Sequence, residues 1–223
     1  MNKKLFKEAI IKFILGVLII GLSIFLPAGT IYYFNGWLFM CILFIPIFIA
    51  GLVMMIKSPS LLKSRLNVKE KEIDQKEVVK LSGLMFLLGF IIAGLNYRYN
   101  WIKLPNIVVI IGSVIFILSY IMYAEVLREN AYLSRVIEVQ KDQKVIDTGL
   151  YKIVRHPMYS TTILLFLSMP LILDSLISFI IFLVYPFIIA KRIKSEEQVL
   201  EQELKGYKEY KKKVKYRLIP FIW

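Results

Sequence analysis

The sequence predicts an all-α fold, an integral membrane helical bundle with four spans and a C-terminal helical hairpin. Apolar residues make up 58% of the 223-residue chain and the mean hydropathy is +0.66, values typical of membrane proteins. A helix needs about 20 consecutive apolar residues to cross a bilayer. Four stretches reach or approach that length: Ala9–Pro27, Gly36–Ile56, Leu81–Leu95 (extendable to Tyr99) and Leu104–Leu127.

A fifth apolar region, Thr161–Ala190, is too long for a single span. Pro170 and the pair Asp174-Ser175 interrupt it, and a proline inside a helix removes a backbone hydrogen-bond donor. We therefore expect a helical hairpin here. The sequence leaves open whether both arms of this hairpin cross the bilayer completely.

The basic residues lie almost entirely on one side of the predicted spans. Of the 29 Lys and Arg residues, only Arg98 and Lys103 lie on the other side. The positive-inside rule then places both termini in the cytosol and predicts a multi-pass protein of the cell (inner or plasma) membrane. This topology, with attraction to anionic lipid headgroups, explains the net charge of +13, so no nucleic-acid partner is expected.

Three features of the N-terminal half complete the predicted scaffold. No small-residue cleavage site follows Leu26-Pro27, so the first span is interpreted as a retained anchor rather than a signal peptide. A cap-like Ser58 followed by Pro59 predicts a short interfacial helix up to Leu66. The single cysteine, Cys41, excludes an internal disulfide, and one Cys with one His leaves too few ligands for a structural zinc, so no metal is expected.

The only histidine lies in the pentapeptide Arg155-His156-Pro157-Met158-Tyr159, where a charged segment meets the last apolar region. Proline disfavours helical dihedrals in the preceding residue and suits the first position of a helix, so a helix is predicted to begin at Pro157. The free amide groups and positive dipole end of that helix suit a carboxylate or a phosphate. Taken alone, His156 is equally well explained as a helix-entry residue bonded to the backbone.

Arg192 and Glu196 are four residues apart, so on a helix they share one face at the cytosolic mouth of the last apolar segment. A guanidinium and a carboxylate in this place suit a cationic cofactor and an anionic or polar substrate group. The alternative for this pair is a solvated salt bridge, and for Tyr151 and Tyr159 it is the role of interfacial aromatics. The order and spacing of all these residues along the chain therefore indicate function more strongly than any single residue does.

The stretch from Gly149 to Tyr159 resembles the G-x-Y-x-x-x-R-H-P-x-Y signature of the isoprenylcysteine carboxyl methyltransferase family, which belongs with the membrane phospholipid methyltransferases. The end of the chain resembles the family's E-E-x-x-L…Y-x-x-Y…V…I-P pattern. The residues that carry this second resemblance are Glu196, Glu197, Leu200, Tyr207, Tyr210, Val214, Ile219 and Pro220. The resemblance as a whole covers residues 125–223 and, less specifically, Ser58–Leu66.

This resemblance implies an S-adenosyl-L-methionine-dependent methyltransferase whose cofactor site lies on the cytosolic side near the C-terminus. It implies that Arg192 and Glu196 are catalytic, with Arg192 facing the substrate. The implied cofactor contacts are Gln140, Lys144, Val145, Ile146, Tyr151, His156, Pro157, Met158, Tyr159 and Glu196. We therefore expect one membrane domain, residues 1–223, with a transmembrane scaffold (1–127) and a cofactor-binding and catalytic portion (128–223).

Methyl transfer from a sulfonium is an in-line displacement, in which positioning and the exclusion of water supply much of the acceleration. A carboxylate or thiolate acceptor needs no strong base, and Arg192 would orient it, whereas an amine would need Glu196 or Glu197 as a base. The expected acceptor is a lipophilic small molecule or lipid: a carboxylate as in isoprenylcysteine, a thiol, an amine or a phospholipid headgroup. Membrane lipids are the other expected partner, and the sequence assigns no oligomeric state.

Two other interpretations compete with this one. A membrane reductase of the sterol or steroid type would use a nicotinamide cofactor and would not require a G-x-G-x-x-G motif. A non-catalytic membrane protein would keep the bundle but leave His156 and Glu196 far apart, with no cavity between them. The combination of Arg155-His156-Pro157 with Glu196-Glu197 favours the methyltransferase.

Overall fold

The computed structural model describes residues 3–66, 73–133 and 137–223, with the backbone only for residues 73–75. Over these ranges every regular element is a helix, as the sequence predicts. The elements in chain order are α1 (Lys3–Ala28), α2 (Phe34–Lys57), α3 (Pro59–Leu66), α4 (Ile73–Tyr99), α5 (Asn106–Glu129), the 3-10 helix η1 (Gly149–Lys152), α6 (Pro157–Ile172), α7 (Leu176–Phe182), α8 (Tyr185–Glu203) and α9 (Tyr207–Lys213).

Within the described ranges, five helical segments are long and apolar enough to cross a membrane. They are α1, α2, residues 76–99 of α4, α5, and α7 with α8 taken together as Leu176–Glu203. The first three contain the corresponding predicted spans, whereas the predicted span Leu104–Leu127 begins two residues before α5, which starts at Asn106 after Pro105. Leu22 and Ile121 are more than half exposed on the outer faces of α1 and α5. Such large apolar surfaces suit contact with lipid, so the chain is a multi-pass membrane protein.

The last apolar region folds back on itself, with α6 packed against α7 and α8. The chain reverses at Asp174, which adopts a left-handed backbone (φ 53°), and the Ser175 hydroxyl accepts the amide of Ser178 at the start of α7. The expected interruption therefore lies at Asp174-Ser175, whereas Pro170 stays inside α6. Pro170 is tolerated because it lies in the last turn, where a single carbonyl loses its helical partner.

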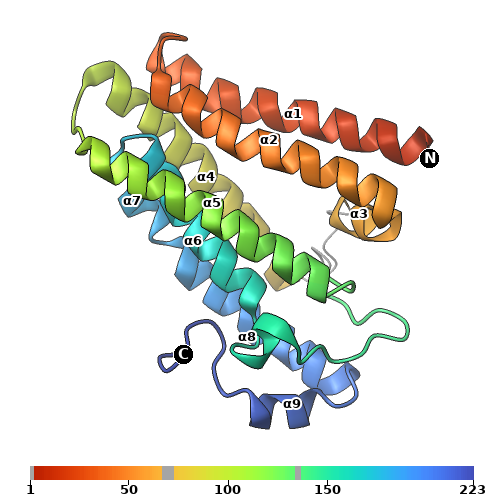
Figure 1. Cartoon of the computed structure of the whole chain (residues 1–223). Helices are drawn as coiled ribbons and strands as arrows, with labels where there is room; N and C mark the ends of the chain where they lie inside the picture. The colour runs from red at the N-terminus through yellow and green to blue at the C-terminus, as the bar shows by residue number, and fades with distance from the viewer. Residues whose placement is uncertain (1–2, 67–72, 134–136) are drawn as a thin grey trace.

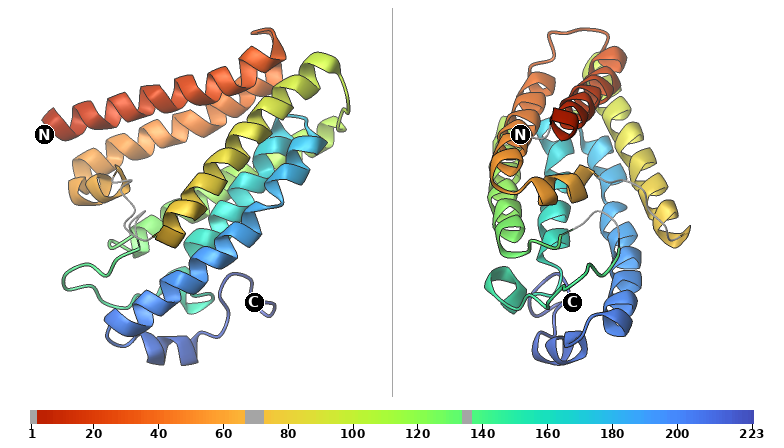
Figure 2. Two further views of the ribbon diagram at one scale, coloured as in Figure 1. Left: turned by 180° about the vertical axis from the view of Figure 1, so that it is seen from behind. Right: turned by 90° about the vertical axis from the view of Figure 1, so that its right-hand side faces the viewer.

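Helices α1 and α2 form an antiparallel pair that diverges from the bundle of α4 to α8 (Figures 1 and 2). The separation is greatest at the end of the pair where α1 begins. The pair meets the bundle at its opposite end, where α1 packs on α4. A Cβ atom on Gly94 would lie 2.4 Å from the carbonyl oxygen of Ile24, so only glycine permits this close approach. Ile24 and Ala93 are fully buried at this contact.

Aromatic side chains fill the centre of the bundle. Phe86 of α4 meets Phe166 of α6 and Phe182 of α7 edge-on, with ring centroids 4.7 and 5.4 Å apart. Phe39 and Phe116 add the neighbouring faces of α2 and α5 to the same cluster, and both are fully buried. Edge-to-face rings add about 0.5–1.5 kcal/mol beyond the area they bury, so this core fixes α6 relative to its neighbours.

The charged elements η1, α9 and the ends of α6 and α8 gather at one end of the bundle (Figure 1). The helix predicted to begin at Pro157 does so, and the short helix predicted after Ser58 begins at Pro59. The segment after α9 then returns to the start of α6. The amides of Arg155 and His156 donate to the carbonyls of Tyr216 and Arg217, each at 2.9 Å. The backbone just before α6 is thus fixed by the end of the chain, while the side of the membrane on which it lies stays a prediction.

Candidate functional site

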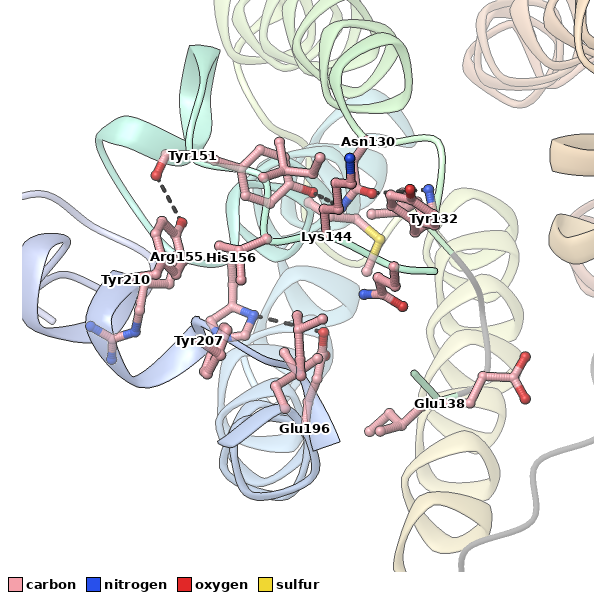
Figure 3. Close-up of a pocket in the computed structure, with 18 of the residues that line it drawn as sticks. Asn130, Tyr132, Glu138, Lys144, Tyr151, Arg155, His156, Glu196, Tyr207 and Tyr210 are labelled. Carbon is pink, nitrogen blue, oxygen red and sulfur yellow. Dashed lines mark hydrogen bonds and ion pairs between the residues drawn. The ribbon is translucent and has the colours of Figure 1, made fainter. Parts of the chain in front are cut away.

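A cavity opens at this charged end, between the foot of α5, the segment before η1, the start of α6, the outer half of α8, and α9 (Figure 3). Its volume is about 100 Å³. Its lining consists of Asn130, Tyr132, Leu133, Ile137, Glu138, Gln143, Lys144, Val145, Ile146, Tyr151, Arg155, His156, Met158, Tyr159, Arg192, Glu196, Leu200, Leu204, Tyr207 and Tyr210. Residues from two distant parts of the sequence therefore share one site.

One wall of the cavity rests on a buried charged cluster around Glu197. The carboxylate accepts Arg155 Nε at 2.7 Å and Arg217 Nε at 3.0 Å, and its Oε1 lies 3.2 Å from His156 Nε2. Arg155 also donates from Nη1 to two carbonyls of the tail, at 2.7 Å each. Because Glu197 is only 3% exposed and already has these partners, its role is to orient the arginine and the imidazole.

The opposite ring nitrogen of the histidine faces the cavity. His156 Nδ1 lies 3.9 Å from Glu196 Oε1, a contact drawn as a dashed line in Figure 3. The non-catalytic interpretation required these two residues to be far apart with no cavity between them, and this expectation is wrong. His156 supplies no side-chain cap to the first turn of α6, and the amides of Tyr159 and Ser160 donate to the carbonyl of His156 at 3.0 and 3.2 Å. Anion binding at this helix end stays a prediction.

Tyr159 links the two residues predicted from one face of α8. Its hydroxyl donates to Glu196 Oε2 at 2.6 Å and accepts Arg192 Nε at 2.9 Å. Arg192 is 8% exposed and Tyr159 is 5% exposed. The alternative of a solvated salt bridge does not fit the buried Arg192, although Glu196 is 24% exposed, because a surface pair would leave the guanidinium in water. The three side chains form a preorganised polar group at the membrane side of α6 and α8.

A second hydrogen-bonded set holds η1 in place. Asn130 at the end of α5 donates from Nδ2 to the hydroxyl of Tyr151 at 2.9 Å, and the Tyr210 hydroxyl donates to the Tyr151 carbonyl at 2.8 Å (Figure 3). Burial raises the pKa of Tyr151, although the hydrogen bond from Asn130 opposes the shift. The interfacial-aromatic alternative therefore describes neither Tyr151 nor Tyr159, because both are buried against the site.

The hydroxyl of Tyr207 is buried in the cavity lining without a hydrogen-bond partner. Gly206 allows the sharp turn before it, with a left-handed φ of 88°. Burial raises the pKa of Tyr207, and the carboxylates of Glu197 and Glu196 raise it further, so the phenol stays a hydrogen-bond donor. A buried donor without a partner is costly, which is the condition expected where a bound molecule supplies the acceptor.

The cavity brings together nine of the residues predicted for the site: Lys144, Val145, Ile146, Tyr151, His156, Met158, Tyr159, Arg192 and Glu196. Two others lie outside its lining. Pro157 begins α6, and the side-chain amide of Gln140 donates to the Tyr132 carbonyl at 2.7 Å. Gln143 lines the cavity at this place instead. The assignments of Pro157 and Gln140 as cofactor contacts stay predictions.

Other lining residues were not expected as cofactor contacts. Tyr207 and Tyr210 belong to the tail motif, and Asn130 lies at the foot of a predicted span, so the sequence carried a signal for these three. Tyr132, Leu133 and Leu204 carry no such signal, because only the folding of the segment before η1 against α8 and α9 brings them to the cavity. Sequence order alone does not specify that contact.

Comparison with known families gives one match. Residues 110–202, from α5 to the end of α8, match the model described as the isoprenylcysteine carboxyl methyltransferase (ICMT) family. Comparison with curated proteins found no match. The matched region contains most of the cavity lining, including His156, Arg192 and Glu196. Residues 110–202 of this chain are therefore similar to the isoprenylcysteine carboxyl methyltransferase family, a family of membrane methyltransferases.

Proposed function

We propose that this protein is an integral membrane, S-adenosyl-L-methionine-dependent methyltransferase that methylates a lipophilic acceptor from the cytosolic side. One observation carries the proposal. The start of α6, with His156 and Tyr159, converges with Arg192 and Glu196 of α8 on a single cavity. The family match supplies the reaction class, and the donor set of the cavity supports the cofactor.

The residues of the cavity fit the three chemical parts of this cofactor. The positive dipole end of α6 at Pro157 suits its carboxylate, and the carboxylate of Glu196 suits its ammonium group. The apolar side chains of Val145, Leu200 and Leu204, with the phenol of Tyr207, suit a flat base that needs both packing and a hydrogen-bond donor. When bound, the cofactor supplies an electrophilic methyl group on a positively charged sulfur.

Arg192 is the residue best suited to an anionic acceptor. Its guanidinium is held by Tyr159, so an acceptor carboxylate would meet a preorganised donor and lose little orientation entropy. A carboxylate needs no general base, which agrees with the family description. Should the acceptor be an amine, Glu196 is a better base than Glu197, because Glu197 already accepts from two arginines.

The first experiment is calorimetric titration of detergent-purified protein with S-adenosyl-L-methionine and, separately, with a nicotinamide dinucleotide. We expect saturable binding of the methyl donor only. Glu196→Gln and His156→Ala should each weaken it by about tenfold or more, because each removes a group from the cavity wall. Glu201→Gln is the matched control, since Glu201 lies on the same helix but pairs with Lys211. Folded protein that fails to bind the donor at millimolar concentration, or that binds only the dinucleotide, would sink the proposal.

The acceptor class is then read from the chemistry of the product. Membranes containing the protein are incubated with methyl-labelled cofactor, and the labelled lipid fraction is treated with alkali. A methyl ester releases labelled methanol, whereas methylated thiols and amines keep the label. We expect release, with Arg192→Lys lowering the turnover number more than the donor affinity, because a lysine cannot hold a carboxylate in a bidentate fashion. An alkali-stable label would show that the acceptor is not a carboxylate.

A further inference from the structure

A second cavity lies in the N-terminal part of the molecule, outside the residues that match the family. It occupies about 320 Å³ between the first half of α1, the last half of α2, and α3. Its walls are mainly apolar, with Phe13, Phe44 and Phe48 packed along one side. No residue of the candidate catalytic site lines it.

Two cations lie at the end of this cavity nearest α3. Lys12 already has partners, because its Nζ lies 2.6 Å from both Glu8 Oε1 and the Leu66 carbonyl. Arg65 donates from Nη2 to the hydroxyl of Tyr123, and its guanidinium lies 5.6 Å from the centre of that ring. Its Nη1, however, is buried without a hydrogen-bond partner, and within the described chain no carboxylate pairs with it. A buried guanidinium nitrogen without a partner favours an anion as the missing acceptor.

The wall of the cavity is also open at one defined place. Gly51, in the middle of α2, lines the cavity, and a Cβ atom added there would meet nothing within 4 Å. Helices α1 and α2 expose large apolar side chains on their outer faces, as at Ile14 and Leu18 of α1. We therefore expect the lipid of the bilayer to surround this part of the molecule. The molecule that fits is therefore an apolar chain with an anionic group at one end.

We propose that this cavity binds one acyl chain of an anionic phospholipid of the bilayer, and that Arg65 binds the phosphate of its headgroup. Charge complementarity selects the anionic lipid, because α3 with its two basic residues lies on the side predicted to face the cytosolic leaflet, where anionic lipids are enriched. The apolar walls along α1 and α2 then take the chain towards the membrane interior. The proposal does not depend on the methyltransferase activity.

The test uses the full-length protein in phosphatidylcholine nanodiscs that contain a trace of phosphatidylglycerol with a photoactivatable diazirine on its acyl chain. After illumination, peptide mapping locates the label. We expect labelling concentrated in residues 6–16 and 44–55, and about tenfold less of it with the same diazirine on phosphatidylcholine. Equal labelling by the two lipids would overturn the proposal, because Arg65 would then select no charge.

Two pairs of variants separate the cavity from the charge. Gly51→Leu should fill the cavity and abolish the label. The control is Gly83→Leu on α4, because Gly83 also has open space around its Cβ position but lines none of the cavities described, and it should leave the label unchanged. Arg65→Gln should remove the preference for phosphatidylglycerol, and Arg65→Lys should retain most of it. Binding of S-adenosyl-L-methionine and a monodisperse elution profile report folding in each case. If Gly51→Leu is folded and labelled like the wild type, the cavity is not the lipid site.

Discussion

The end of the molecule that carries the proposed cofactor site and the α1–α3 region are stabilised in opposite ways. At the proposed catalytic end, Glu197 joins Arg155, His156 and Arg217 through charged contacts of 2.7 to 3.2 Å. In the α1–α3 region, meaning helices α1, α2 and α3, aromatic and aliphatic side chains surround a cavity. The backbone of this region packs closely onto the rest of the bundle at Gly94.

This difference separates two tasks. Charged hydrogen bonds are directional, so they hold the cofactor-facing side chains in one geometry before anything binds. Apolar contacts are non-directional, so the cavity of the α1–α3 region can accommodate a lipid acyl chain of variable shape without the loss of a specific hydrogen bond. We infer that stability and binding at the proposed catalytic end depend on single polar atoms, whereas in the α1–α3 region they depend mainly on the volume of the side chains.

The largest expected effect comes from breaking the cluster at the proposed catalytic end. Glu197→Gln removes the charge that partners the buried Arg155 and the partly exposed Arg217, and breaking a buried pair typically costs about 3–5 kcal/mol. We expect the melting temperature in detergent to fall strongly and cofactor binding to be lost. Glu201→Gln on the same helix should change stability by less than about 1 kcal/mol, because its partner Lys211 is partly exposed. Equal effects from the two variants would show that the cluster contributes little.

The next effect tests the attachment of the α1–α3 region. Gly94→Ala places a Cβ atom 2.4 Å from the Ile24 carbonyl, so α1 must shift, at a cost of about 1–3 kcal/mol. Cofactor affinity should stay within about twofold of wild type, because this contact lies at the opposite end of the bundle. Gly83→Ala, which meets open space, should be neutral or slightly stabilising. Thermal unfolding and calorimetry together distinguish these results, and a loss of affinity in Gly94→Ala would show that the two regions are coupled.

A smaller effect concerns the buried hydroxyl at the cavity wall. Tyr207→Phe removes the unpartnered donor, so the free protein should be as stable as wild type or slightly more stable. Cofactor affinity should fall by about three- to tenfold, because the bound molecule loses one hydrogen bond. Tyr216→Phe is the control, since this partly exposed tyrosine does not line the cavity. Unchanged affinity in Tyr207→Phe would remove this residue from the binding site.

The smallest effect is a dependence on alkaline pH. Burial raises the pKa of Tyr207 and of Tyr210 in the folded protein, whereas the phenols of an unfolded chain ionise near pH 10. Above about pH 10, unfolding therefore releases protons and the free energy of unfolding falls as the pH rises. Denaturant titrations from pH 8 to pH 11 should show this fall, with a shallower slope in Tyr207→Phe. An identical slope in both proteins would mean that this phenol does not contribute.

Much of the fold was predictable because lipid and water impose strong periodic constraints on composition. The apolar run from Ala9 to Pro27 could only be a span, and Pro59 and Pro157 each mark the first turn of a helix because proline lacks a donor that such positions do not need. The prediction that Pro170 interrupts the last apolar region is wrong, because the effect of a proline depends on its distance from the end of the helix. Helix α6 ends just after Pro170, where the backbone of Asp174 turns left-handed.

The sequence by itself determined the membrane class, the long apolar helices and the two motifs that supply much of the cavity lining, but not η1, α9 or the break between α7 and α8. Hydropathy, proline positions and residue spacing are local properties, and they do not require knowledge of what packs against what. Only the tertiary structure decided that Glu197 is a buried support while Glu196 faces the cavity, since adjacent carboxylates are equivalent until α8 docks on α6. It also decided that Arg65 lacks a carboxylate partner among the described residues and that α1, α2 and α3 leave a cavity, because volume and unmet hydrogen bonds arise only from packing.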